Sequence, residues 1–277
     1  MSSPRPSQTL RRFCYLAQGR ALEINLLHQI FATRTLVSLT WDEHRNESIF
    51  LPNSSWSEGR RTLYHSIQNI DEYDYIVFMD GDVITTTQEL SVFEEVVSTL
   101  RPAVAVPRVL KTEQFTKKLD PHRYPWVLAY DSDEQFQCFD ARILSDHFGG
   151  SPYVSEYDDI SWWYPCILNQ MLIRKHYWRS FIQVNGIEVR NESHGSYPND
   201  FDPGFIFPEI KRLGVHTTLP LSAGCKFSSN RRLEKRMFSI DKRLFSLLSF
   251  ASRWLYKPFD PKAPAPILGP ELKAMIR

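Results

Sequence analysis

Hydrophobic residues follow two different spacings along the chain. Compact apolar runs, which are typical of β-strands, occupy residues 11–18, 33–42, 75–79 and 103–110. Runs with the three-to-four-residue spacing of amphipathic helices occupy residues 23–31, 53–70 and 87–102. Strands and helices therefore alternate. This alternation predicts an α/β fold with a mostly parallel central sheet flanked by helices.

The hydrophobic pattern is less regular at the helix boundaries and in the second half of the chain than in the first half. In 53–70, a loop is expected to lead into a helix with Ser57 as its N-cap. Residues 127–139 are expected to hold a strand, residues 160–178 a helix starting at Pro165, and residues 181–194 another strand. The long irregular loops between them are typical of active-site walls.

The composition changes near Ser229. We expect a catalytic domain over residues 1–229, with a donor half at about 10–110 and an acceptor half at 111–229, and a C-terminal extension over 230–277. Residues 231–257 contain eight basic and two acidic residues, a local net charge of +6, in an amphipathic pattern. Such a helix either contacts an anionic membrane surface peripherally or packs its apolar stripe against the domain. The proline-rich stretch 257–273 is expected to be mostly extended.

Charge and cysteine content narrow the class of protein. The 33 basic and 32 acidic residues nearly cancel, so no nucleic-acid partner is expected. Cys14, Cys138, Cys166 and Cys225 lie far apart, which indicates neither a zinc site nor a disulfide framework. No window resembles a signal peptide or a membrane span, so a cytoplasmic location is expected.

Two aspartates end the apolar run at residues 75–79. In extended backbone Asp80 and Asp82 point the same way, and Gly81 between them lets a ligand approach the main chain. Two close carboxylates need a cation, and oxygen ligands suit Mg²⁺ or Mn²⁺, which usually bridges to substrate phosphates. The alternative is an Asp-Gly-Asp turn that merely ends a strand.

The stretch "YDYIVFMDGD", placed behind two earlier β/α units, resembles the metal motif of nucleotide-sugar-dependent glycosyltransferases of the GT-A fold. The resemblance covers residues 10–225 and is specific only around Asp80 and Asp82. It implies a GT-A-like sheet, a divalent metal on Asp82 that holds the donor diphosphate, and an Asp80 that touches ribose or metal. The implied reaction moves a hexosyl or pentosyl group from a nucleotide diphosphate sugar, with a UDP-sugar as the expected donor, to a hydroxyl of a glycan or glycoconjugate.

The same resemblance implies further donor contacts. "SEGRRTLYHSI" is similar to the family segment that contacts base and ribose, so Arg60 or Arg61 is a candidate donor contact. Asp42, at the end of an earlier strand, occupies a place where family members often hold the nucleoside. A late histidine often completes the metal site in this family, and His194 is preferred here over His216.

The acceptor side is expected in the second half of the chain. Asp158 or Asp159 is a candidate base for the acceptor hydroxyl, or else caps the following helix. Trp162 and Trp163 form either a platform for a sugar ring or part of the core. Asp131, in "DSDEQF" with Asp133 and Glu134, offers acceptor hydrogen bonds or belongs to a solvated loop.

Two other functions fit part of the sequence. Haloacid dehalogenase-like phosphatases also place Asp-x-Asp after an apolar strand, with the first aspartate, here Asp80, as nucleophile. In that family the motif usually lies on the first strand, whereas about seventy residues precede it here. A non-catalytic relative that binds donors or membranes is the other alternative.

Overall fold

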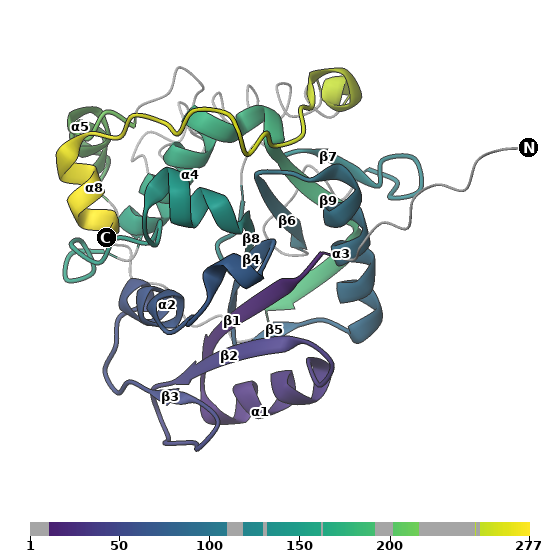
Figure 1. The fold of residues 1–277 in the computed structure, drawn as a ribbon. Coiled ribbons are helices and arrows are strands. Elements are labelled where there is room, and N and C mark those ends of the chain that lie inside the picture. The colour runs from purple at the N-terminus through teal and green to yellow at the C-terminus, as the bar shows by residue number, and fades with distance from the viewer. Residues whose placement is uncertain are drawn as a thin grey trace, which may run out of the picture.

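The computed structural model describes residues 11–109, 119–129, 132–161, 163–191, 202–215, 247 and 250–277. Within this part of the chain, nine strands form a sheet flanked by helices (Figure 1). The strands are β1 Phe13–Gly19, β2 Thr35–Thr40, β3 Ile49–Phe50, β4 Tyr75–Asp80, β5 Val83–Ile84, β6 Val104–Val109, β7 Trp126–Leu128, β8 Phe136–Asp140 and β9 Phe181–Asn191. The main helices are α1 Ala21–Ile30, α2 Trp56–His65, α3 Thr87–Leu100, α4 Trp163–Tyr177, α5 Pro203–Arg212 and α8 Pro270–Ile276.

The sheet has the order β3-β2-β1-β4-β8-β6-β9-β5, and β7 pairs with β9 outside this path. Strands β1, β2, β3 and β4 pair in parallel, as do β6 and β9. Strand β8 runs antiparallel to both β4 and β6, so these two strands share one direction. Six of the nine described strands therefore run the same way. The predicted α/β class, with a mostly parallel sheet flanked by helices, is confirmed.

The two faces of the sheet are covered by different helices. Ile76 and Phe78 of β4 belong to one core cluster, together with apolar residues of α2, α4, α5 and α8. Tyr75, Val77 and Met79 belong to the other cluster, with apolar residues of α1 and α3. Successive side chains of a strand point to opposite faces. A side chain at an even position of β4, such as Asp80, therefore faces the α2 side.

Several predicted boundaries were wrong in detail. The N-cap of α2 is Ser55, not Ser57, because the Ser55 hydroxyl accepts the Glu58 N–H and the Glu58 carboxylate accepts the Ser55 N–H. Helix α4 begins at Trp163 rather than Pro165. The stretch 127–139 contributes to two strands, β7 and β8, instead of one.

The C-terminal stretch also differs from its prediction. The stretch 257–273 was expected to be mostly extended, but its last residues belong to helix α8 (Pro270–Ile276), whose first position is Pro270. Proline suits this position because its fixed φ is already helical. Leu272, Met275 and Ile276 of this helix are buried in the core cluster on the α2 side. The domain division at 229 and 230 stays a prediction.

The sequence also predicts an amphipathic helix over residues 231–257. The structure describes only residues 247 and 250–257 of this segment, so most of the predicted helix lies outside the described residues. Among the described helices, none is both long enough and apolar enough to cross a membrane.

Candidate functional site

A cleft of about 440 Å³ opens at the carboxyl ends of β1 and β4. Ligands of α/β sheets bind at this end of the parallel strands. Gln18 of β1 and Asp80 of β4 are register partners there. The residues lining the cleft are Gln18, Arg20, Glu23, Trp41, Asn53, Ser54, Ser55, Trp56, Asp80, Gly81 and Asp82. The predicted pair Asp80 and Asp82 thus shares one wall of the cleft.

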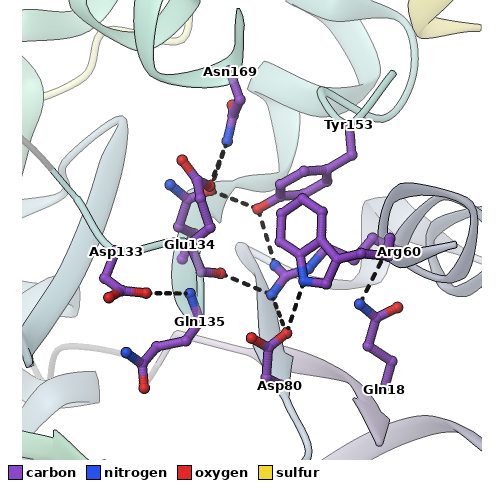
Figure 2. Close-up of polar contacts among 10 residues, drawn as sticks. Gln18, Arg60, Asp80, Asp133, Glu134, Gln135, Tyr153 and Asn169 are labelled. Atoms are coloured by element: carbon purple, nitrogen blue, oxygen red, sulfur yellow. Dashed lines mark hydrogen bonds and ion pairs between the residues drawn. The ribbon is translucent and has the colours of Figure 1, made fainter. Parts of the chain in front are cut away.

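Asp80 is held from the α2 side. Trp56, Arg60 and Leu63 occupy positions i, i+4 and i+7 of α2, so they share the helix face that lies on the sheet. Arg60 Nη2 donates to Asp80 Oδ1 at 2.7 Å, and Trp56 Nε1 donates to the same oxygen at 3.2 Å (Figure 2). Asp80 Oδ1 accepts both hydrogen bonds, and the other carboxylate oxygen, Oδ2, accepts neither of them.

The Arg60 side chain has no exposed surface, whereas 24% of the Asp80 side chain is exposed. Arg60 also donates to the Tyr153 hydroxyl at 3.1 Å and to the Glu134 carbonyl at 2.8 Å. Its guanidinium carbon lies 4.3 Å from the centre of a Trp56 ring. A buried cation needs such partners, because an uncompensated charge inside a protein is costly. Arg60 therefore holds Asp80 from the interior of the protein, and it does not line the cleft itself.

Behind Arg60 lies a buried polar network. Tyr153 donates to Gln137 Oε1 at 2.6 Å, and Asn169 Nδ2 donates to Gln137 Oε1 at 2.7 Å and to Glu134 Oε2 at 3.0 Å. Burial raises the pKa of the Glu134 carboxyl to about 8, although Arg60 and Asn169 oppose the rise. Burial likewise raises the pKa of Asp80, against the pull of the Arg60 charge.

Gly81 has a role that the sequence did not indicate. Its N–H donates to the Gln18 carbonyl at 2.6 Å, and a Cβ at this position would meet the Gly19 Cα at 2.7 Å. The space beside Gly81 is therefore taken by the backbone of β1. The glycine is required for the close approach of β1 and the chain after β4.

The side chains present are chemically suited to a hard cation. Asp82 is partly exposed and lines the same cleft as Asp80 and Glu23. Mg²⁺ is usually bound through one or two carboxylates, with water and substrate phosphates as its other ligands. Among the residues that the structure describes, no group of three His, Cys, Asp or Glu side chains lies close enough together to hold a metal without such help. His194, the predicted third ligand, lies outside the described residues.

Asp158 lies beside the cleft. Its Oδ2 accepts a hydrogen bond from the hydroxyl of Ser55, which is both the N-cap of α2 and part of the cleft wall. Burial raises the pKa of Asp158, and the Ser55 bond opposes the rise. Asp159 is exposed. Neither aspartate caps α4, because that helix begins at Trp163.

Two other predicted site residues, Arg61 and Asp42, are not among the residues that line this cleft. Arg61 Nη1 donates to the Ser155 hydroxyl at 3.4 Å and to the Met275 carbonyl at 3.2 Å, in a second hollow formed with Glu58 and His65. Asp42 is exposed, and its Oδ1 accepts the Ala21 N–H at 2.9 Å.

On the acceptor side, Trp163 is partly buried and packs against the core. Asp131 and Trp162 lie outside the described residues. The predicted acceptor contacts at these positions stay predictions.

Some residues of the cleft were not singled out from the sequence. Gln18 and Trp56 are examples, and Gln18 Nε2 donates to the Trp56 carbonyl at 3.1 Å. Gln18 was recognisable as a polar residue at the carboxyl end of a strand. Trp41, whose exposed fraction is 38%, lines the cleft next to the predicted Asp42.

No protein-family model matches the chain, and no curated protein matches its sequence. Several solved structures are similar to it in fold. S. aureus TarS 1–349 in complex with UDP-GlcNAc has a TM-score of 0.46 and 10% identity, over 78% of this chain and 70% of that one. Glucosyl-3-phosphoglycerate synthase from Mycobacterium tuberculosis in complex with Mg²⁺ and UDP has a TM-score of 0.43 and 11% identity, over 69% and 78%. At these identities the likeness concerns the path of the backbone, and it assigns no role to any residue here.

Proposed function

We propose that the protein is a metal-dependent glycosyltransferase of the GT-A type, which moves a sugar from a nucleotide diphosphate donor to a hydroxyl acceptor. The observation that carries this proposal is the pair of carboxylates that line one cleft at the carboxyl ends of β1 and β4. Asp80 is oriented by Arg60 and Trp56, and Asp82 lies beside it on the wall of the same cleft. Carboxylates in that position suit a cation that bridges to phosphate.

The two aspartates have different surroundings and therefore different roles. Asp82 would hold Mg²⁺ or Mn²⁺, and Asp80 would offer Oδ2 to the metal or to the donor ribose, with His194 as the proposed further ligand. The metal, when bound, supplies positive charge that stabilises the diphosphate leaving group. Arg60 acts through Asp80, since its side chain has no exposed surface. Asp42 and Arg61 are retained as proposed donor contacts.

Asp158 is the better placed of the two candidate bases. It bonds to Ser55 at the edge of the cleft, and its raised pKa favours proton acceptance. In an inverting transfer, the acceptor oxygen forms a bond to the anomeric carbon, the bond from that carbon to the diphosphate oxygen breaks, and the hydroxyl proton moves to Asp158. Asp131, Trp162 and Trp163 are the proposed acceptor contacts.

The test is the release of free nucleotide from a panel of UDP-, GDP-, CMP- and dTDP-sugars, with Mn²⁺ or with a chelator. We expect metal-dependent release from one donor, a UDP-sugar, and loss of release in Asp82→Asn. The matched control is Asp71→Asn. Asp71 is exposed, belongs to the short 3₁₀ helix Ile70–Glu72, and does not line the cleft. If every sugar donor is inert while a generic phosphomonoester is hydrolysed, Asp80 is a phosphatase nucleophile instead and the proposal fails.

A further inference from the structure

Three large apolar side chains are exposed together near the C-terminal end of the chain. Leu247, Phe250 and Trp254 have exposed fractions of 66%, 67% and 70%. Residues 250–255 are helical, in the yellow-green part of the ribbon in Figure 1, and residue 247 is helical as well. The spacing of three and four residues places the three side chains on one helix face. The rings of Phe250 and Trp254 lie 5.5 Å apart, centre to centre.

The opposite face of this helix is already bound to the body of the protein. The Ser252 hydroxyl accepts the Leu128 N–H of β7 at 2.8 Å. The Tyr256 hydroxyl donates to the Leu100 carbonyl at 2.7 Å, and its ring lies 5.0 Å from that of Trp126. These contacts fix the orientation of the helix. Leu247, Phe250 and Trp254 are therefore directed away from the sheet by the same packing that holds Ser252 against it.

The charge of the surrounding segment identifies the kind of partner. Residues 231–257 carry a net charge of +6, whereas the other 250 residues contain 25 basic and 30 acidic residues. In the described part of the segment, Arg253 and Lys257 are exposed beside the apolar side chains. A second copy of this chain that docked through the same segment would bring the same positive charge to the contact and be repelled. An anionic lipid surface attracts the charge and also accepts Trp, Phe and Leu at the depth of its headgroups.

We propose that Leu247, Phe250 and Trp254, with the exposed Arg253 and Lys257 beside them, form a docking surface for an anionic lipid bilayer. The apolar side chains enter the interface, and the lysine and arginine side chains pair with anionic headgroups. This surface lies on a different element from the cleft beside Asp80. The inference therefore stands or fails independently of the proposed transferase activity.

Co-sedimentation of the full chain with lipid vesicles tests this surface. The vesicles contain phosphatidylcholine alone or phosphatidylcholine with phosphatidylserine. We expect binding only in the presence of phosphatidylserine, and weaker binding as salt is added. The double variant Phe250→Ser and Trp254→Ser should lower the affinity about tenfold or more, because both aromatic anchors are lost.

The matched control is the double variant Leu22→Ser and Leu26→Ser, which removes exposed apolar side chains of α1, with exposed fractions of 73% and 55%. We expect it to bind vesicles as the parent protein does. An unchanged melting temperature would show that both variants are folded. The proposal is overturned if the parent protein ignores phosphatidylserine vesicles, or if the Phe250 and Trp254 variant binds them equally well. Concentration-dependent self-association that the same variant abolishes would instead identify a second copy as the partner.

Discussion

Arg60 Nη2 lies 2.7 Å from Asp80 Oδ1, and the arginine side chain is completely buried while the aspartate reaches the cleft. The ion pair therefore connects the interior of the protein with its candidate site. A buried cation that loses its anion is left uncompensated, whereas an exposed carboxylate that loses a neighbour is solvated by water. Asp80 and Asp82 should consequently differ in what they contribute to stability, although both belong to the proposed site.

Replacing Asp80 should destabilise the fold, and replacing Asp82 should not. We expect Asp80→Asn to lower the free energy of unfolding by about 1–3 kcal/mol, because Arg60 keeps its hydrogen bonds but loses its counter-charge. Asp82→Asn, at a partly exposed position, should cost less than about 1 kcal/mol. Urea unfolding of the two variants measures the difference. Equal losses would show that Arg60 does not depend on Asp80.

The stability of the protein should depend on the ionisation of Glu134. Burial raises the pKa of this carboxyl from 4.5 to about 8, so between these pH values the folded protein holds a proton that the unfolded chain has released. Stability contributed by this group is present at the acidic end of the window and is lost as the pH rises towards 8. Glu134→Gln removes the titrating group, so its stability relative to the parent protein should grow across this window.

Chemical unfolding of Glu134→Gln and the parent protein at several pH values between 4.5 and about 8 checks this expectation. Glu72→Gln, on an exposed turn, is the control and should follow the parent curve. Parallel curves for Glu134→Gln and the parent would show that the buried carboxyl does not hold its proton.

The contact between Gly19 and Gly81 should tolerate no side chain. In Gly81→Ala the new Cβ would meet the Gly19 Cα at 2.7 Å, a clash between backbone segments. We expect a loss of about 1–3 kcal/mol in the free energy of unfolding. Gly186→Ala is the comparison, because its Cβ would meet only Val92 Cγ1, at 3.3 Å, and that side chain can adjust. Similar melting temperatures for both variants would contradict this reading of the strand contact.

Asp158 should be needed for transfer but not for donor binding. If it is the base, Asp158→Asn should lower kcat by about 100-fold or more while leaving the donor affinity nearly unchanged. Asp159→Asn, one residue along the chain at an exposed position, should have little effect on kcat. Steady-state kinetics with the active donor and its acceptor provide this comparison. Loss of activity in Asp159→Asn alone would transfer the role to that residue.

The sequence predicted the sheet and one wall of the site, and the reasons are local. The uninterrupted apolar run before Asp80 marks a buried strand, and the two-residue period of a strand places Asp80 on the side of Ile76 and Phe78. No local pattern indicates that β4 lies beside β1. The sequence therefore predicted neither the pairing of Gln18 with Asp80 nor the contact between Gly19 and Gly81.

Arg60 shows a different limit of sequence interpretation. Arginine in an amphipathic helix is usually solvated, and its burial here results from tertiary contacts with Asp80, Tyr153 and Glu134 that lie 20, 93 and 74 residues away in the sequence. Its position at the i+4 spacing between Trp56 and Leu63 was the available signal, since that spacing marks the inner face of α2. The proline content of the tail similarly obscured the spacing of Leu272, Met275 and Ile276 that buries α8.

Isothermal titration of the protein with UDP, in Mn²⁺ and in chelator, shows whether a metal in the cleft beside Asp80 and Asp82 binds the donor diphosphate. We expect binding in Mn²⁺ that the chelator weakens at least about tenfold, because the metal would bridge carboxylate and diphosphate. We expect an equal loss in Asp82→Asn, with Asp71→Asn unchanged. UDP binding that depends on neither the metal nor Asp82 would show that the cleft is not a metal-dependent donor site.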